Sequence, residues 1–346
     1  MSHEYRNQKD KTNNKKIDEL LLEMPLFVED FYYHLTAKGS STNTIKSYLY
    51  EINVFLRFIQ GILKISDIKS IEVTDLDRIS ITHIEIYISK SENGVDLSAS
   101  AKRRKLSVLR HMYKYYISAE SIKTNPTLNV GGPRIKEHDV IRLTDSQVKA
   151  LLSCVKNQDG VTDRSKIYNR RMALRDLAIV TVLLGTGMRI SELVGLNISD
   201  FDTTDPDRPC FHIIRKGGDS DTVYFVPQVL EAVSDYLDIS RKSLKPADGE
   251  NALFISITGR RMGVAAVQKM MKKYCSAIDL PDNISPHKLR ATFATAVYTD
   301  TKDIYAIKDA LHHKSIDTSK HYISGRTERL EKASKAAGKL FEASHD

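Results

Sequence analysis

The fold of this chain is constrained most by apolar residues that recur at helical spacing. They occur on both sides of one segment that is rich in glycine, proline and charged residues. In STNTIKSYLYEINVFLRFI (41–59) they recur every three or four residues, and MALRDLAIVTVLLG (172–185) and VAAVQKMMKKYCSAI (264–278) are also helical in type. Between them, TLNVGGPRIKEHDVIRL (127–143) is typical of a linker. Because 346 residues are long for one core and sufficient for two, we predict two mainly helical domains.

The first predicted domain is a helical bundle at residues 17–130, followed by a linker at 131–142. Residues 1–16 are polar and charged, so we expect a disordered tail there. Ser41 or Thr42 suits the N-cap of the helix 41–59. The other expected helices lie within IDELLLEMPLFVEDFYYHL (17–35), ISITHIEIYISKS (79–91) and SASAKRRKLSVLRHMYKYYI (98–117).

The last of these helices carries basic residues without interleaved acids, beside an apolar stripe. A surface helix usually mixes both signs of charge, so a purely basic stripe favours contact with phosphates, although a solvated helix face remains the alternative. The formal net charge of +8 is compatible with a polyanionic partner. The basic residues of this stripe are Lys102, Arg103, Arg104, Lys105, Arg110 and Lys114.

The second predicted domain, at residues 143–326, is mostly helical with a small antiparallel sheet. Thr144 and Gln147 have the spacing of a capping box at the start of a helix. CFHIIRKGGDSDTVYFVP (210–227) contains two β-rich runs around Lys216 and two glycines, which predicts a hairpin with the lysine at its turn.

Two short motifs in this domain place cationic side chains at helix starts. In LLGTGMRISELVGL, a glycine turn positions Arg189 at a helix N-terminus, which suits an anion, although a local pair with Glu192 is the alternative. In SPHKLRATFATAVY, Ser285 and Pro286 begin a helix (the former as N-cap) whose His287 and Arg290 share a face. That pair can equally consist of ordinary surface residues.

The stretch LHHKSIDTSKHYI (311–323) permits a metal site, a solvated helix end or a nucleophile with its helpers. Adjacent histidines cannot share one helix face, and no HExxH motif accompanies them, which argues against a metal. Three cysteines (Cys154, Cys210 and Cys275) lie far apart without CxxC spacing, so we expect buried free thiols.

Together these motifs resemble the tyrosine recombinases of the phage integrase family, and the branch with this compact plan is Xer-like. The resemblance covers nearly the whole chain and implies a mainly α fold, with an N-terminal core-binding (SAM-like) bundle and a mostly helical catalytic domain. It also implies site-specific DNA recombination without a metal or nucleotide cofactor. The motifs contribute, in chain order, the catalytic candidates Arg189, Lys216, His287, Arg290, His313 and Tyr322. The DNA-binding candidates are Thr44, Lys46, Lys102, Arg103, Arg104, Lys105 and Arg110.

The resemblance assigns a role to each catalytic candidate. Tyr322 is the nucleophile that forms a 3′-phosphotyrosyl intermediate, His287 accepts its proton, and Lys216 protonates the leaving 5′ oxygen. Arg189 and Arg290 neutralise the charge that develops on the phosphate.

Two positions depart from the family pattern. Ala291 stands where many members have a second histidine, and His312 stands where a glycine usually precedes the catalytic histidine. His313 is therefore the expected donor to the phosphate, and His312 and His321 are interpreted as bystanders.

The expected partners are a double-stranded recombination site, three further copies of the chain in a homotetramer on two duplexes, and an accessory protein. An amphipathic helix at 327–346 is expected to dock on a neighbouring protomer. Without a signal peptide or an apolar run long enough for a membrane, the expected location is the cytoplasm, at the nucleoid. Alternatives to chromosome dimer resolution are an integrase or transposase of a phage or mobile element, a type IB topoisomerase and a non-catalytic DNA-binding regulator.

Overall fold

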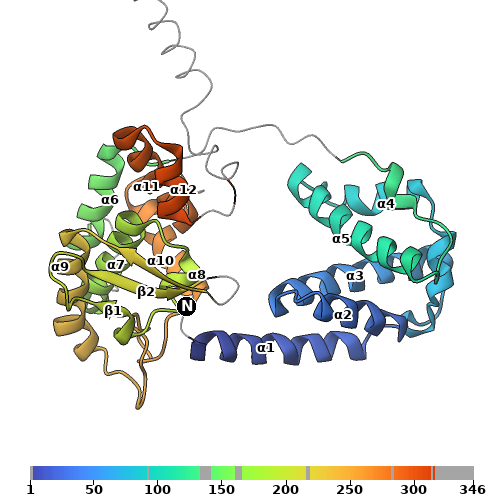
Figure 1. The fold of residues 1–346 in the computed structure, drawn as a ribbon, viewed down its shortest axis with the longest axis horizontal. Helices are drawn as coiled ribbons and strands as arrows, with labels where there is room; N and C mark the ends of the chain where they lie inside the picture. The colour runs from blue at the N-terminus through green and yellow to red at the C-terminus, as the bar shows by residue number, and fades with distance from the viewer. Residues whose placement is uncertain are drawn as a thin grey trace, which may run out of the picture. The chain divides into compact units, whose positions relative to one another are not determined.

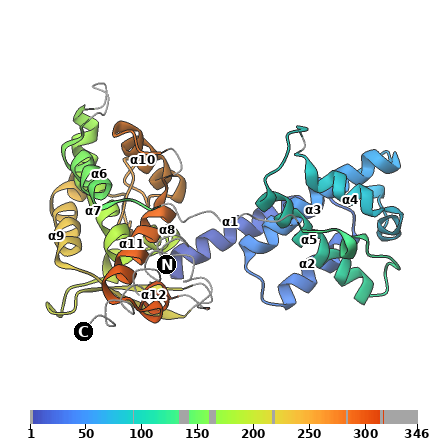
Figure 2. The same ribbon diagram turned by 90° about the horizontal axis from the view of Figure 1, so that it is seen from above.

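The computed structural model describes residues 3–91, 93–132, 142–159, 166–215, 219–281, 284–312 and 315, with backbone alone at 3–4 and 166–171. The chain folds into two compact units, one of residues 7–137 and one of residues 138–346 with residues 1–6. Both are drawn in Figure 1 and, from above, in Figure 2. None of the helices in the described ranges is long and apolar enough to cross a membrane.

The N-terminal unit is a helical bundle. α3 packs against both α2 and α5, and α4 packs against α5 (Figure 1). Its α-helices are α1 (His3–Leu22, which belongs to this unit from residue 7 onward), α2 (Phe27–Ala37), α3 (Thr42–Leu63), α4 (Ile81–Ser89) and α5 (Ala99–Ser118). Short 3-10 turns are η1 (Ile68–Ser70), η2 (Val73–Arg78) and η3 (Pro126–Asn129).

The helix starts in this unit follow local capping chemistry. Ser41 caps α3 by accepting a hydrogen bond from the Thr44 amide at 3.2 Å, and Ser98 caps α5 in the same way through Ala101. Buried tyrosines then tie α5 to distant segments, because a buried hydroxyl requires a partner. The Tyr116 hydroxyl donates to the Phe27 carbonyl at 2.9 Å.

The expected disordered tail at residues 1–16 is wrong from residue 3 onward, because α1 begins at His3. Two polar side chains of this segment, Asp10 and Asn13, have tertiary partners. Thr42 donates to Asp10 at 2.5 Å, Asn13 donates to Thr42 at 3.1 Å, and Lys46 donates to Asn13 at 2.7 Å. Asn13 is only 4% exposed and Ile17 joins the core. Composition alone could not reveal these partners on α3.

The single helix expected within 17–35 is also wrong. α1 ends at Leu22 and α2 begins at Phe27, with Pro25 between them. Proline lacks an amide hydrogen and its ring clashes with the preceding turn, so the helix cannot continue through it.

The C-terminal unit surrounds the buried helix α7, which packs against α6, α9 and α11 (Figure 2). Ile179, Val180 and Leu183 are fully buried, as expected for a helix apolar on several sides. The helices are α6 (Asp145–Asn157), α7 (Lys166–Thr186), α8 (Ile190–Leu193), α9 (Pro227–Asp235), α10 (Val264–Ala277), α11 (Pro286–Thr301) and α12 (Ile304–Leu311), with the turn η5 (Ile198–Asp200) and the π-helix η6 (Tyr236–Arg241). The capping box of Thr144 and Gln147 is confirmed at the start of α6.

The expected hairpin is confirmed as two strands of a three-stranded antiparallel sheet. β1 (Phe201–Asp202) pairs with β2 (Cys210–Ile214), which pairs with β3 (Ser220–Tyr224). The sequence does not predict β1, because two residues cannot display an alternating pattern. The mainly helical fold with a small sheet is thus confirmed, while most of the expected linker and the expected helix at 327–346 lie outside the described residues.

Candidate active site

Arg290 joins three segments of the C-terminal unit. Pro286 begins α11 directly after its N-cap Ser285, as expected, and this start places Arg290 in the second turn, where it is only 3% exposed. Its guanidinium donates to the carbonyl of Gly187, in the turn before α8, and to the carbonyl of Leu311, at the end of α12, at 2.7 Å. A buried guanidinium is tolerated only when hydrogen bonds compensate its lost hydration.

The glycine turn before α8 is required by packing. Gly187 has a positive φ of +61°, and a Cβ built there would lie 2.3 Å from the ring of Phe293 and 2.8 Å from Leu311. Only glycine permits both the backbone conformation and this approach of α11 and α12.

Arg189 follows this turn as the N-cap of α8, with its side chain 42% exposed. Its backbone amide and its guanidinium donate to the two carboxylate oxygens of Glu192, at 2.8 and 2.9 Å. Arg189 therefore forms the local pair with Glu192 that was the alternative to an anion site. Its side chain nevertheless still reaches solvent. Burial alone raises the pKa of Glu192, but Arg215 and the bonds from Arg189 bring that pKa below its ordinary value.

The base of the hairpin continues this network. Arg215, the residue before Lys216, donates to Glu192 at 3.0 Å and to Asp221 at 2.8 Å. His312 Nδ1 in turn lies 2.6 Å from Asp221 Oδ2. A chain of charged and polar side chains thus runs from α8 through the base of the hairpin to the end of α12. The sequence did not identify Arg215 or Asp221 as members of the site, because both lie close to the hairpin turn and no motif distinguishes them from ordinary turn residues.

His287 lies at the start of α11 with its side chain at the surface. Partial desolvation, followed by the charges of Arg290, Lys288 and Arg189, lowers the pKa of His287 below its ordinary value of 6.5. The imidazole is therefore neutral at physiological pH and available as a proton acceptor.

The structure thus brings together three of the six catalytic candidates, since Arg290 holds the turn that precedes Arg189 and both arginines act on the pKa of His287. The other three candidates, Lys216, His313 and Tyr322, lie outside the described residues, as does His321. His312, interpreted as a bystander, makes the contact with Asp221 described above.

The DNA-binding candidates divide into two groups. Lys105 is buried, pairs with Glu51 at 3.4 Å and lies over the ring of Tyr87, and Arg110 donates to the carbonyls of Thr127 and Val130. The buried Lys105 stabilises its own unit, which corrects its assignment to phosphate contact, whereas Arg110 keeps an exposed side chain beside its two carbonyl partners. The remaining candidates lie at least partly at the surface of α3 and α5: Thr44, Lys46, Lys102, Arg103 and Arg104.

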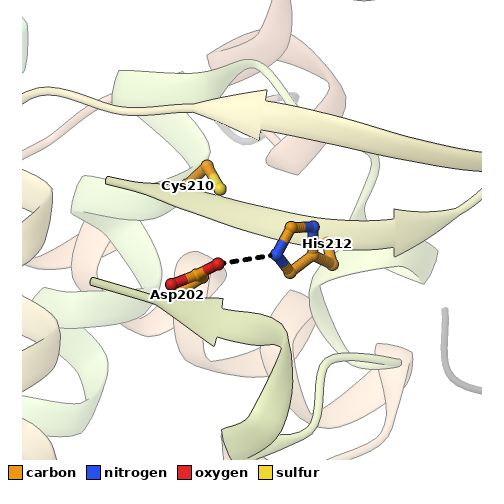
Figure 3. A group of neighbouring side chains, drawn as sticks. All are labelled: Asp202, Cys210 and His212. Carbon is orange, nitrogen blue, oxygen red and sulfur yellow. Dashed lines mark hydrogen bonds and ion pairs between the residues drawn. The ribbon is translucent and has the colours of Figure 1, made fainter. Parts of the chain in front are cut away.

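A separate cluster on the sheet, formed by Asp202, Cys210 and His212, has the donor atoms of a metal site (Figure 3). Asp202 lies opposite Cys210 in the β1–β2 register and accepts from His212 Nε2 at 2.9 Å. Its other oxygen accepts two hydrogen bonds from Thr204. These two bonds, together with the bond from His212, lower the pKa of Asp202 to about 2. Burial raises the pKa of Cys210, which disfavours the thiolate that metals bind. The hydrogen bond between Asp202 on β1 and His212 on β2 accounts for the proximity of these two side chains.

The comparisons with known proteins agree with the motifs. The profile of the phage integrase family matches residues 141–329, and that of the phage integrase N-terminal SAM-like domain matches residues 28–120. Tyrosine recombinase XerC of Caldanaerobacter subterraneus is 32% identical over 317 residues, covering 87% of this chain and 83% of that protein. Tyrosine recombinase XerD of Corynebacterium glutamicum is 27% identical over 289 residues, covering 82% and 88%.

Solved structures share the fold. XerH bound to a palindromic difH substrate, in a post-cleavage complex, has a TM-score of 0.63 at 20% identity and covers 86% of this chain and 81% of its own. The Tn1549 transposon integrase with circular intermediate DNA has a TM-score of 0.64 at 20% identity, covering 88% and 98%. The chain accordingly belongs to the phage integrase family and is a Xer-like tyrosine recombinase, an enzyme that cleaves and rejoins DNA.

Proposed function

We propose that this site-specific recombinase resolves chromosome dimers, by attack of Tyr322 on a DNA phosphate held by Arg189 and Arg290. The observation that carries the proposal is the pair of hydrogen bonds made by Arg290. One bond fixes the carbonyl two residues before Arg189, and the other fixes the carbonyl two residues before His313. Segments that are far apart in the sequence therefore converge on one buried cation.

The proposed reaction needs positive charge and a proton acceptor at this point. Two arginines stabilise the charge that develops on a phosphodiester in its transition state. Neutral His287 accepts the proton of Tyr322, whose ordinary pKa near 10 makes it a weak nucleophile without assistance. Lys216 protonates the leaving 5′ oxygen and His313 donates to the phosphate, and the 3′-phosphotyrosyl ester retains the energy needed to rejoin a new strand.

DNA contact is proposed for the exposed part of the basic surface, now without Lys105. Arg104 is 77% exposed on α5, and Lys46 lies in the first turns of α3. Phosphate contacts of this kind release condensed counterions, so affinity falls as salt rises. This surface consists of Thr44, Lys46, Lys102, Arg103, Arg104 and Arg110.

Chromosome dimer resolution is proposed because the chain resembles Xer recombinases over most of its length. That role requires four protomers on two duplexes, with the segment 327–346 docked on a neighbour, and it places the enzyme at the nucleoid in the cytoplasm. An accessory protein that regulates the order of strand exchange is part of the same proposal.

The test captures covalent complexes in the source cells. Cells expressing tagged protein are lysed in detergent strong enough to remove non-covalent complexes, and the DNA that remains attached is sequenced. We expect attachment at one chromosomal locus, lost in Tyr322→Phe and retained in Tyr305→Phe, a matched change at an exposed tyrosine of α12. Attachment at the ends of a mobile element would overturn the chromosomal role. Attachment that survives Tyr322→Phe would overturn the nucleophile.

A further inference from the structure

His312 ends α12 in a conformation that most residues avoid. It is the C-cap, with φ 50° and ψ 52°, in the left-handed region. Glycine and asparagine adopt this conformation most readily, and for other residues it carries a modest cost. An interaction of the side chain can offset that cost.

The side chain of His312 supplies that interaction. Its Nδ1 lies 2.6 Å from Asp221 Oδ2, on β3, and the same oxygen accepts from Arg215 Nε at 2.8 Å. The preceding residue, Leu311, is fixed through its carbonyl by Arg290. Two consecutive residues at the end of α12 are therefore held by different elements, α11 and the hairpin.

The charges around His312 fix the direction of this bond. A carboxylate only accepts, so Nδ1 must carry the hydrogen. Burial and Arg215 lower the pKa of His312, while Asp221 and Glu192 oppose that change and Arg290 adds to it. The ring hydrogen therefore lies on Nδ1 in this close pair with Asp221.

We propose that His312 is a positioning residue for cleavage, which holds the segment leading to His313 against the base of the hairpin leading to Lys216. This inference rests on the proposed function of those two residues. Without the bond to Asp221, α12 remains attached to Arg290, but the direction in which the chain leaves α12 is no longer coupled to the hairpin. The expected loss is in the rate of cleavage, whereas DNA affinity stays unchanged.

The experiment compares His312→Gly with His312→Asn. Both residues accept the left-handed conformation, but only asparagine offers a side-chain donor to Asp221. Covalent complex formation is measured in single turnover on a duplex carrying the captured site, together with DNA affinity and thermal unfolding. We expect His312→Gly to slow the step by roughly tenfold, the effect of one lost hydrogen bond to a charged group, and His312→Asn to restore most of the rate.

Further variants separate the possible failures. In an Asp221→Asn background, His312→Gly should slow cleavage little further, because the charged acceptor is already gone. A glycine variant as fast as the wild type, or an asparagine variant as slow as glycine, overturns the positioning role. Parallel losses of rate, affinity and melting temperature in His312→Gly overturn it as well, because they indicate a purely structural contact. Failure of the wild type to form any complex rejects instead the proposed function.

Discussion

At the scale of single residues, Arg290 contributes most to the site. The sequence predicted that it shares a helix face with His287, but its burial and its two carbonyl partners follow from the packing of α7, α11 and α12. The network of Glu192, Arg215 and Asp221 was unpredictable for the same reason, since its members come from different elements. Motif spacing identifies residue types, whereas tertiary packing determines their partners.

Arg290→Lys tests the structural half of this role. A lysine ammonium lacks the two separate NH2 groups with which the guanidinium reaches both carbonyls. We therefore expect the free energy of opening α11 and α12 to fall by roughly 2 kcal/mol. Hydrogen exchange of their backbone amides during a urea titration measures this loss. Lys288→Arg, the reverse change two residues away, should alter stability by less than about 0.5 kcal/mol. Equal effects of the two changes would contradict the role assigned to Arg290.

The pH dependence of cleavage tests His287. Its neutral form is the proton acceptor, so cleavage falls as pH drops through the pKa of His287, which lies below 6.5. Lys288→Gln removes one of the charges that lower this pKa, so the acid limb of the pH–rate profile should move to higher pH. The profile is measured on the captured site, and an acid limb that does not move would exclude His287 as the titrating base.

At the scale of elements, local chemistry predicted several helix starts and the hairpin. The predicted caps at Ser41 and Thr144 depend on neighbours within three residues, which a sequence displays directly, and the cap at Ser98, which was not predicted, is of the same kind. The polar start of α1 was not predictable, because its residues are ordered by side chains of α3, more than 25 positions away. The break at Pro25, in contrast, follows from proline chemistry that the sequence displays.

α1 also changes the expected DNA-contact surface. A pocket of about 590 Å³ is lined by Lys16 of α1, Lys46 of α3 and Arg104 of α5, among others. Burial, then the charges of Lys16 and Lys9, lower the pKa of Lys46, which indicates that these ammonium groups lie near one another. Glu19, Glu23 and Glu51 also line the pocket, so an anionic partner is expected at the lysines, where like charges gather.

We therefore expect the double change Lys9→Gln and Lys16→Gln to weaken binding to any duplex. The slope of log affinity against log salt concentration should become shallower by the equivalent of up to about two phosphate contacts. The matched control is Lys11→Gln with Lys15→Gln, two exposed lysines of the same helix. Fluorescence anisotropy over a salt series measures both pairs. An equal loss in the control pair would show that net charge, not this surface, determines the affinity.

At the scale of the whole molecule, the two units contribute different functional surfaces. The bundle of residues 7–137 presents the basic surface, and the unit of residues 138–346 contains the arginines and His287. The family, the mainly helical fold and the small sheet were predictable because motif order and helical spacing persist along the chain. The assignment of Lys105 to DNA failed because helical spacing does not distinguish a buried, paired cation from an exposed one.

The most direct test of the account identifies the atom that carries DNA. Captured complexes are digested with nuclease and trypsin, and mass spectrometry locates the residual nucleotide. Cleavage after Lys320 and Arg326 releases HYISGR, in which Tyr322 is the only tyrosine and Ser324 the only other hydroxyl. We expect a nucleotide on Tyr322, and a nucleotide on Ser324 or on any other peptide would contradict the assignment of Tyr322 as the nucleophile.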